Sequence, residues 1–157
     1  MTHMSATGVS GIDLYIKDRS RSKSKRYHWI GCGKPEKFPH NEAELVAGLD
    51  GQPHEFILYL PLYNGVKKVE IGVDAESAST KPVKTKPIVM YSTSILHGGC
   101  SSRLGMSYPA IMGRAIDQPI INLGVSGNGQ AEPEIAELLT ELDPSALLPQ
   151  RQCQRNP

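Results

Sequence analysis

Two stretches decide the fold: Tyr91-Ser92-Thr93-Ser94-Ile95 and, about thirty residues later, Asn122-Leu123-Gly124-Val125-Ser126-Gly127-Asn128. Each follows a short apolar run typical of a buried strand, and each precedes a helical pattern. Strand, helix, strand and helix in succession predict a parallel sheet with right-handed crossovers. Because open α/β sheets bind ligands at the carboxyl ends of their strands, we expect Ser94 and Gly127 to lie together at that edge.

The elements around these stretches follow from periodicity. The apolar runs 87–91 and 119–123 predict strands, and residues 107–116 and 132–142 carry apolar side chains at helical spacing. A third strand would be expected after residue 144. The sequence there holds two leucines, a proline and then a polar run, so it does not resemble a strand.

The first half of the chain has a different pattern. Short alternating or apolar runs predict strands within residues 11–73, and the clearest pair is 56–60 with 69–73, joined by an Asn-Gly turn. Residues 41–49 form a candidate single helical turn. Several short strands with turns between them predict an antiparallel β-sandwich. Residues 74–86 have no apolar period and are interpreted as a linker between a domain at 1–80 and another at 81–157.

Composition excludes several classes of function. The 157 residues carry a net charge of +1, so nucleic acid is not an expected partner. The basic run 17–26 is interpreted as a solvated hairpin loop. Three cysteines without C-x-x-C spacing and five scattered histidines predict neither a metal site nor a cofactor. No stretch is apolar enough for a signal peptide or a membrane span, so we expect a cytoplasmic chain as written, although a longer parent could be exported.

Several motifs together resemble a known family. Gly11-Ile12-Asp13-Leu14-Tyr15 matches the G-x-D-L-Y signature of an N-terminal domain found on SGNH/GDSL-type hydrolases, and residues 60–73 look like the hairpin of that domain. Residues 91–105 and 122–134 resemble the first two blocks of the hydrolase domain itself. The resemblance implies a mixed fold: an N-terminal antiparallel β-sandwich followed by an incomplete, flavodoxin-like α/β hydrolase domain with a parallel sheet.

The resemblance also implies site residues. Ser94 matches the nucleophile, and the amides of Ser94 and Gly127 match donors of the oxyanion hole. Asn156 faintly resembles a third donor. The Asp-x-x-His pair of the family is not recognisable, and His97, with no acid near it in the sequence, is expected to point away from Ser94. Ser92 stands where the family usually has glycine, which predicts crowding of the turn.

The expected function is therefore that of a serine carboxylester hydrolase fragment. Ser94 would attack an acyl ester, with a carbohydrate acetyl ester as one candidate substrate, and we expect little turnover from the chain as it stands. We also expect self-association through an incomplete sheet. Two alternatives stay open: an acyltransferase in a full-length parent, or a non-catalytic ligand- or glycan-binding module. Tyr27, Trp29 and Tyr59 are interpreted as core aromatics rather than as a sugar platform.

Overall fold

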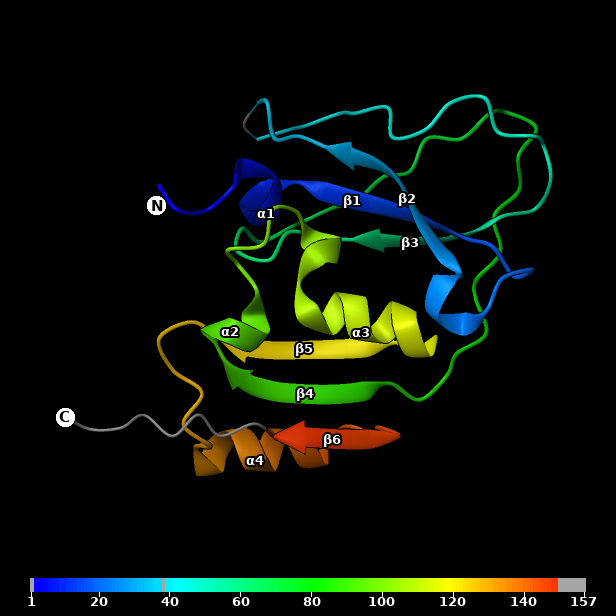
Figure 1. Ribbon diagram of the computed structural model, residues 1–157. Coiled ribbons are helices and arrows are strands. Elements are labelled where there is room, and N and C mark those ends of the chain that lie inside the picture. The colour runs from blue at the N-terminus through cyan, green and yellow to red at the C-terminus, as the bar shows by residue number, and fades with distance from the viewer. Residues whose placement is uncertain (1, 38, 150–157) are drawn as a thin grey trace.

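Two three-stranded sheets organise the part of the chain that the computed structural model describes, residues 2–37 and 39–149 (Figure 1). The first sheet has the strand order β2-β1-β3 and is antiparallel throughout. A bulge between Leu14 and Tyr15 shifts the register of β1 on β2. Its elements are α1 (Ala6–Ser10), β1 (Ile12–Lys17), the 3-10 turn η1 (Lys23–Lys25), β2 (Tyr27–Gly33) and β3 (Glu55–Tyr59).

The predicted hairpin between 56–60 and 69–73 is wrong in its second strand. Residues 60–87 contain neither helix nor strand, and the side chain of Ile71 is 73% exposed. Alternation stabilises a strand only where one face is buried, and no element covers this face. The turn residue Asn64 instead donates its backbone N–H to the Val9 carbonyl of α1, at 3.1 Å. The helical turn expected at 41–49 is also absent.

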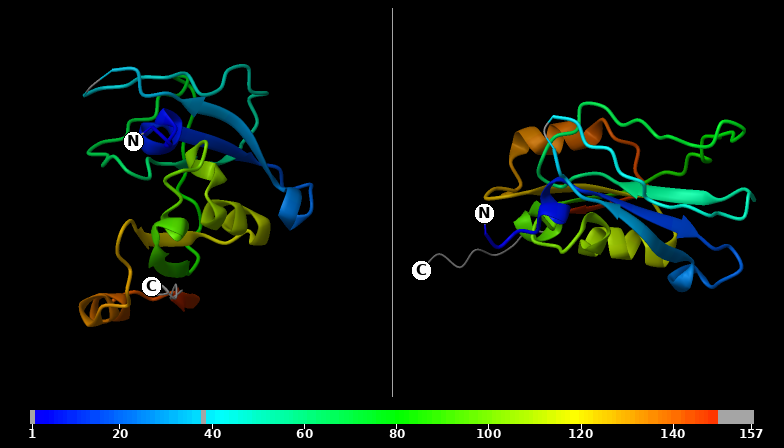
Figure 2. Two further views of the ribbon diagram at one scale, coloured as in Figure 1. Left: turned by 60° about the vertical axis from the view of Figure 1, so that its left-hand side comes forward. Right: turned by 90° about the horizontal axis from the view of Figure 1, so that it is seen from above.

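The second sheet is parallel, with the order β5-β4-β6 (Figure 1). The two helices that connect its strands lie on opposite faces, as the view from above shows (Figure 2). β4 is central, and its Val89 and Met90 are fully buried. The elements are β4 (Ile88–Thr93), α2 (Ser94–His97), the 3-10 turn η2 (Leu104–Met106), α3 (Tyr108–Ile116), β5 (Ile120–Val125), α4 (Pro133–Thr140) and β6 (Ala146–Pro149).

These elements confirm the mixed fold class and most of the α/β prediction, whereas the β-sandwich stays a prediction, because the first half forms a single antiparallel sheet within the described residues. The interpretation of the residues after 144 was wrong, because Ala146–Pro149 pairs in parallel with β4. An edge strand needs backbone partners rather than a buried face, and Leu147 and Leu148 remain about 41% and 40% exposed. Proline is tolerated in β6 because it closes an edge strand.

α3 packs between the two sheets. On the side of the parallel sheet, a Cβ added to Gly113 would lie 3.3 Å from the Ile120 side chain. On the other side, the Tyr59 hydroxyl donates to the Ala110 carbonyl at 3.3 Å, and the Arg114 guanidinium lies 4.0 Å from the centre of the Tyr15 ring. The two halves of the chain therefore pack against each other, and the domain division at residues 80 and 81 stays a prediction.

The aspartate of the G-x-D-L-Y stretch forms part of this junction. Asp13 is 0% exposed, and its carboxylate accepts hydrogen bonds from Trp29 Nε1 at 2.6 Å and from the Gly105 backbone N–H at 2.9 Å. Arg103 Nε lies 3.3 Å from the same carboxylate. Its guanidinium also stacks 4.6 Å from the Trp29 ring. Asp13 thus holds the η2 turn of the second half against β1 and β2.

The interpretation of the aromatic residues as core is wrong for Trp29, and Tyr27 and Tyr59 are only half-buried. Trp29 is 49% exposed, although its indole N–H is held by Asp13. Tyr27 and Tyr59 instead donate hydrogen bonds to Asp117 and to the α3 backbone. The three rings therefore do not form one exposed platform.

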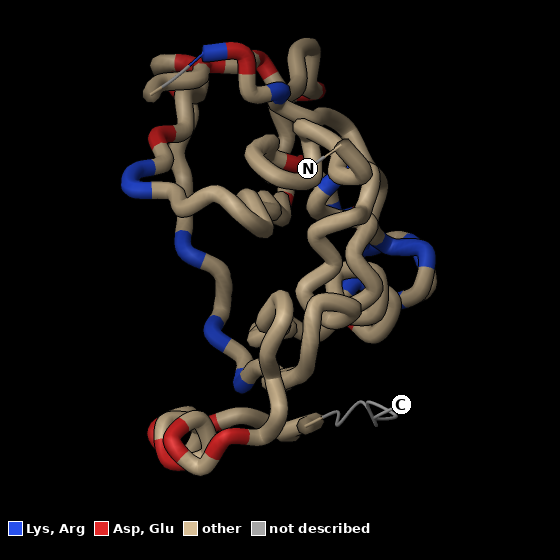
Figure 3. The backbone as a smooth tube through the Cα atoms, turned by 90° about the vertical axis from the view of Figure 1, so that its left-hand side faces the viewer, with Lys and Arg blue, Asp and Glu red and all other residues tan. Residues whose placement is uncertain are grey.

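Charged residues gather in separate regions of the chain. Residues 19–25 of the basic run are exposed, as expected for a solvated hairpin loop. Acidic residues gather on α4, and basic residues recur along residues 60–87 (Figure 3). One charged cluster is largely buried: Asp117, at the end of α3, accepts from Arg26 at 2.6 Å and from Tyr27 at 2.7 Å, and pairs with Lys17 at 2.7 Å.

This cluster predicts a loss of stability in acid. Burial by itself would raise the pKa of Asp117, but hydrogen bonds from Lys17, Tyr27 and Arg26 lower it from 3.8 to about 2. A depressed native pKa contributes stability above the unfolded value, and that stability is lost as the pH falls from about 4 through 2. With solvent screening included, the contribution at pH 7 is about 1–2 kcal/mol.

Urea unfolding at pH 7, 4 and 2.5 tests this prediction. Asp117→Asn should be less stable than the wild type at pH 7 and should lose less stability between pH 4 and 2.5. Asparagine suits the left-handed backbone at this position, where φ is 55°, so the change removes charge without adding strain. Equal acid sensitivity in both proteins would contradict the prediction.

Candidate active site

Ser94 lies where the sequence predicts it. β4 ends at Thr93, and Ser94 is the first residue of α2. Thr93 is opposite Val125 in the parallel pair, so β4 and β5 end at the same edge of the sheet. Because α3 and α4 lie on opposite faces, the crevice between β4 and β5 is the point where open α/β sheets bind ligands (Figure 2).

The turn after β5 contains the predicted second site residue. Gly127 has φ 76° and Gly129 has φ 88°, both in the left-handed region that favours glycine. A Cβ at Gly129 would lie 2.6 Å from the Ser92 carbonyl oxygen, whereas a Cβ at Gly127 would meet nothing within 4 Å. Gly127 is therefore needed for the backbone conformation, and Gly129 also for close approach to β4. The placement of Ser94 and Gly127 on adjacent strand ends is confirmed; their chemical roles stay predictions.

Two residues of β5 hold α2, and with it Ser94, in place. Asn122 Nδ2 donates to the carbonyls of Leu96 at 3.1 Å and His97 at 3.3 Å, and its Oδ1 accepts from the Gly124 N–H at 2.9 Å. A Cβ at Gly124 would overlap the backbone nitrogen of His97. The sequence prediction missed these positioning roles. The sequence signal that could have revealed them is Gly124, because a glycine inside a strand often marks a place where another backbone segment approaches closely.

A cavity of about 200 Å³ opens beside Ser94. Its lining comes from both halves of the chain, and the Tyr63 hydroxyl donates to Ser126 Oγ across the junction at 2.8 Å. Sequence reasoning missed the contribution of the first half, because contacts between distant segments leave no local pattern. The lining residues are His3, Met4, Tyr63, Ser94, His97, Gly99, Cys100 and Ser126.

His97 lines the cavity but is not paired with Ser94. Its Nε2 donates to the Leu62 carbonyl oxygen, and its buried Nδ1 has no hydrogen-bond partner among the described residues. The Tyr63 ring lies edge-on to the imidazole at 4.8 Å between ring centres. Neither ring nitrogen therefore holds the Ser94 hydroxyl, as expected, although His97 lies closer to the site than the sequence suggests.

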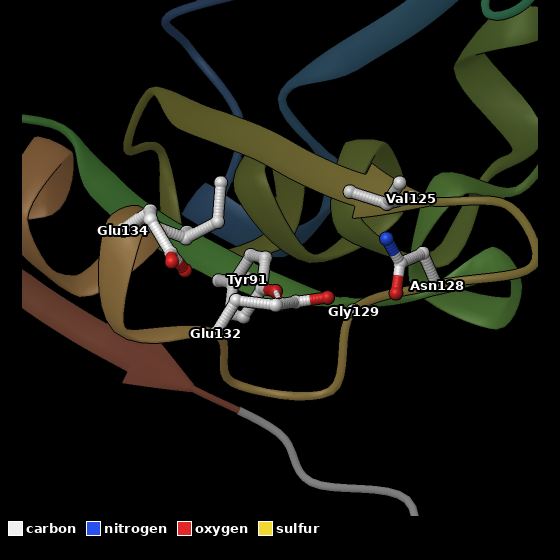
Figure 4. Close-up of a pocket in the computed structure, with 7 residues that line it drawn as sticks. Tyr91, Val125, Asn128, Gly129, Glu132 and Glu134 are labelled. Carbon is white, nitrogen blue, oxygen red and sulfur yellow. Dashed lines mark hydrogen bonds between the residues drawn. The ribbon is translucent and has the colours of Figure 1, made fainter.

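A second hollow, of about 250 Å³, lies near the start of α4 (Figure 4). The Tyr91 hydroxyl donates to Glu132 there, and this hydrogen bond lowers the pKa of the Glu132 carboxyl. The last residue of β5, Val125, contributes to its lining, as do Asn128 and Gly129 of the turn that follows. Ser94 is not part of this lining, so the smaller cavity is the candidate active site.

The remaining predictions concern Asn156, metal ligands and membrane spans. Asn156 lies outside the described residues. Within those residues, no three His, Cys, Asp or Glu side chains gather as metal ligands, and none of the helices is both long and apolar enough to cross a bilayer.

Comparison with known proteins gives the family. Residues 85–149 match the GDSL-like lipase/acylhydrolase family, and residues 1–78 match the N-terminus of SGNH-hydrolase-type esterases. The chain belongs to the SGNH/GDSL hydrolase family. A crystal structure of a candidate GDSL-like lipase from Bacteroides ovatus is 36% identical and superposes on 94% of this chain with a TM-score of 0.81. The chain spans 42% of the length of that protein. No curated protein matches the chain.

One departure from the SGNH/GDSL pattern has no structural cost. Ser92 was expected to crowd the turn before the nucleophile. It lies instead inside β4, opposite Gly124 of β5, and the only non-glycine residues with positive φ in the described part of the chain are Asp117 and Ala131. Serine is tolerated because the backbone here is an ordinary strand and its neighbour is glycine.

Proposed function

We propose that the chain carries the nucleophile and oxyanion donors of a serine carboxylester hydrolase. The observation that supports this most strongly is the position of Ser94: at the carboxyl end of β4, beside the glycine turn of β5 and facing a cavity. Ser94 Oγ attacks the carbonyl carbon of an acyl ester, and the carbonyl oxygen becomes an oxyanion. The backbone N–H groups of Ser94 and Gly127 stabilise that charge.

The remaining steps follow from acyl transfer. The tetrahedral intermediate collapses, the C–O bond to the alcohol breaks, and the alcohol leaves with a proton. Water then hydrolyses the acyl group from Ser94 and releases the acid. Attack by a hydroxyl needs a base that takes its proton, and the hydrogen bond from His97 to Leu62 does not favour His97 in that role.

The substrate proposal is an acyl ester of small size. Family membership supports the ester, and the cavity volume supports a small group next to Ser94. A carbohydrate acetyl ester remains our candidate within this class.

Hydrolysis of p-nitrophenyl acetate by the purified chain tests the proposal. Because no base for Ser94 is identified among the described residues, we expect only slow turnover, a small excess over the uncatalysed rate, together with an acetyl adduct on the peptide that contains Ser94, detected by mass spectrometry. Ser94→Ala should lower the rate to near the uncatalysed level, because it removes the proposed attacking oxygen. Ser77→Ala, an exposed serine in the 60–87 segment, is the matched control and should keep the wild-type rate.

Two results would contradict the proposal. One is turnover that persists in Ser94→Ala, which places the nucleophile elsewhere. The other is a wild-type chain with neither turnover nor an adduct on Ser94.

A further inference from the structure

The cavity beside Ser94 is formed by both halves of the chain. His3, Met4 and Tyr63 come from the first half, and the nucleophile and its neighbours come from the second. Apart from two histidines, none of the described residues that line it has an ionisable group charged at neutral pH. A lining of mixed polar and apolar side chains without a carboxylate, lysine or arginine suits a neutral group rather than an anion or an amine.

Tyr63 is held in this cavity from several directions. Its hydroxyl donates to Ser126 Oγ at 2.8 Å, and its ring packs edge-on against His97. The neighbouring backbone is fixed as well: the Leu62 carbonyl accepts from His97, and the Asn64 N–H donates to Val9 at 3.1 Å. A ring fixed in this way can act as a rigid wall.

Gly99 shows how closely the ring approaches the second half. A Cβ added to Gly99 would lie 2.5 Å from Tyr63 Cε2 and 2.9 Å from the Met4 methyl group. Gly99 does not have a positive φ, so glycine is needed here for space. The Tyr63 ring therefore packs so closely against the backbone after α2 that position 99 has no room for a side chain.

We propose that Tyr63 is a specificity-determining residue, and that its ring limits the group bound beside Ser94 to a short acyl chain. The inference rests on the proposed ester function. A water molecule occupies about 30 Å³ in the liquid, so a cavity of about 200 Å³ has room for a group equivalent to about seven waters. Acyl chains of a few carbons match that size, and longer chains meet the ring.

Binding of N-methyl amides of the linear C2, C4, C6 and C8 acids to the full chain tests this proposal. These amides are neutral analogues of esters that need no turnover, and ligand-observed NMR gives their dissociation constants. The wild type should bind the C4 amide more tightly than the C8 amide. Tyr63→Ala should lower the C8-to-C4 ratio of dissociation constants about tenfold, since one or a few methylene groups that a pocket must exclude change affinity by that order.

Three further variants distinguish a Tyr63 ring that limits acyl-chain length from one that only supports the fold. Tyr63→Phe keeps the ring but loses the bond to Ser126, so it should keep the wild-type ratio. Tyr63→Leu should shift the ratio in the same direction as alanine, and it serves if the alanine variant does not fold. Gly65→Ala should change nothing, because a Cβ there meets no atom within 4 Å.

The results of these experiments distinguish a specificity role of Tyr63 from a structural one. Equal weakening for all chain lengths in Tyr63→Ala and Tyr63→Leu would show a structural role and overturn the proposal, as would a wild type that binds none of the amides. The same shift measured in a Ser94→Ala background supports the proposal, because these ligands need no nucleophile. If the ester assay fails while this shift occurs, the proposed catalysis is wrong and the role of Tyr63 in the cavity stands.

Discussion

Asp13→Ala is expected to lower the free energy of unfolding by about 3–5 kcal/mol, because it breaks a buried ion pair and leaves its partners unpaired. Trp29 Nε1 and the Gly105 N–H donate hydrogen bonds to the fully buried Asp13 carboxylate, and Arg103 forms an ion pair with it. Without the carboxylate these polar groups stay buried away from water and lose the interaction that compensates for their desolvation. The effect is a large fraction of the stability of a typical domain.

Guanidinium unfolding measures this loss. Trp29 is the single tryptophan, so its fluorescence reports the junction directly, and far-UV circular dichroism reports the whole chain. Asp13→Asn keeps the shape and one acceptor and should cost clearly less. Lys86→Ala removes an exposed ion pair with Asp143 and should change stability by less than about 1 kcal/mol. If Asp13→Ala lowers the free energy of unfolding by less than about 1 kcal/mol, as the control does, the prediction is wrong.

Gly124→Ala is expected to displace α2 and to abolish turnover that depends on Ser94. The added methyl group would overlap the backbone nitrogen of His97, and backbone cannot yield as a flexible side chain does. Overpacking of this kind costs about 3 kcal/mol. It would also disturb the hydrogen bonds from Asn122 to the carbonyls of α2.

The measurements are p-nitrophenyl acetate hydrolysis and chemical unfolding of the same preparation. Gly72→Ala is the matched control, because Gly72 has open space around it and lies in the exposed 60–87 segment. An alanine variant at position 124 with wild-type rate and stability would show that α2 tolerates displacement from β5.

The sequence predicts the position of Ser94 better than the cavity around it. Ser94 and Gly127 each follow an apolar strand and precede a helix, and this order is encoded locally. The strand at 146–149 was missed because an edge strand is held by backbone bonds to β4 rather than by a buried face. The strand at 69–73 was overpredicted because alternation alone does not provide a covering surface.

The role of Tyr63 could not be predicted for a different reason. Its hydrogen bond to Ser126 joins positions 63 residues apart, and only the packing of the two halves brings them together. Asp13 is similar, since its partner Gly105 is 92 residues away. Self-association stays a prediction, and the outer edge of β6, with the half-exposed Leu147 and Leu148, is the surface to which it applies.

The position of α3 between the two sheets has a consequence for folding cooperativity. Because the helix packs on Tyr59 and Tyr15 on one side and on β5 on the other, neither sheet can melt without uncovering it. We therefore expect the segments on either side of the predicted boundary near residue 80 to unfold together. A ligand beside Ser94 contacts both halves, so by mass action its binding stabilises them together, and saturating ligand should raise the melting temperature of both sheets as one transition.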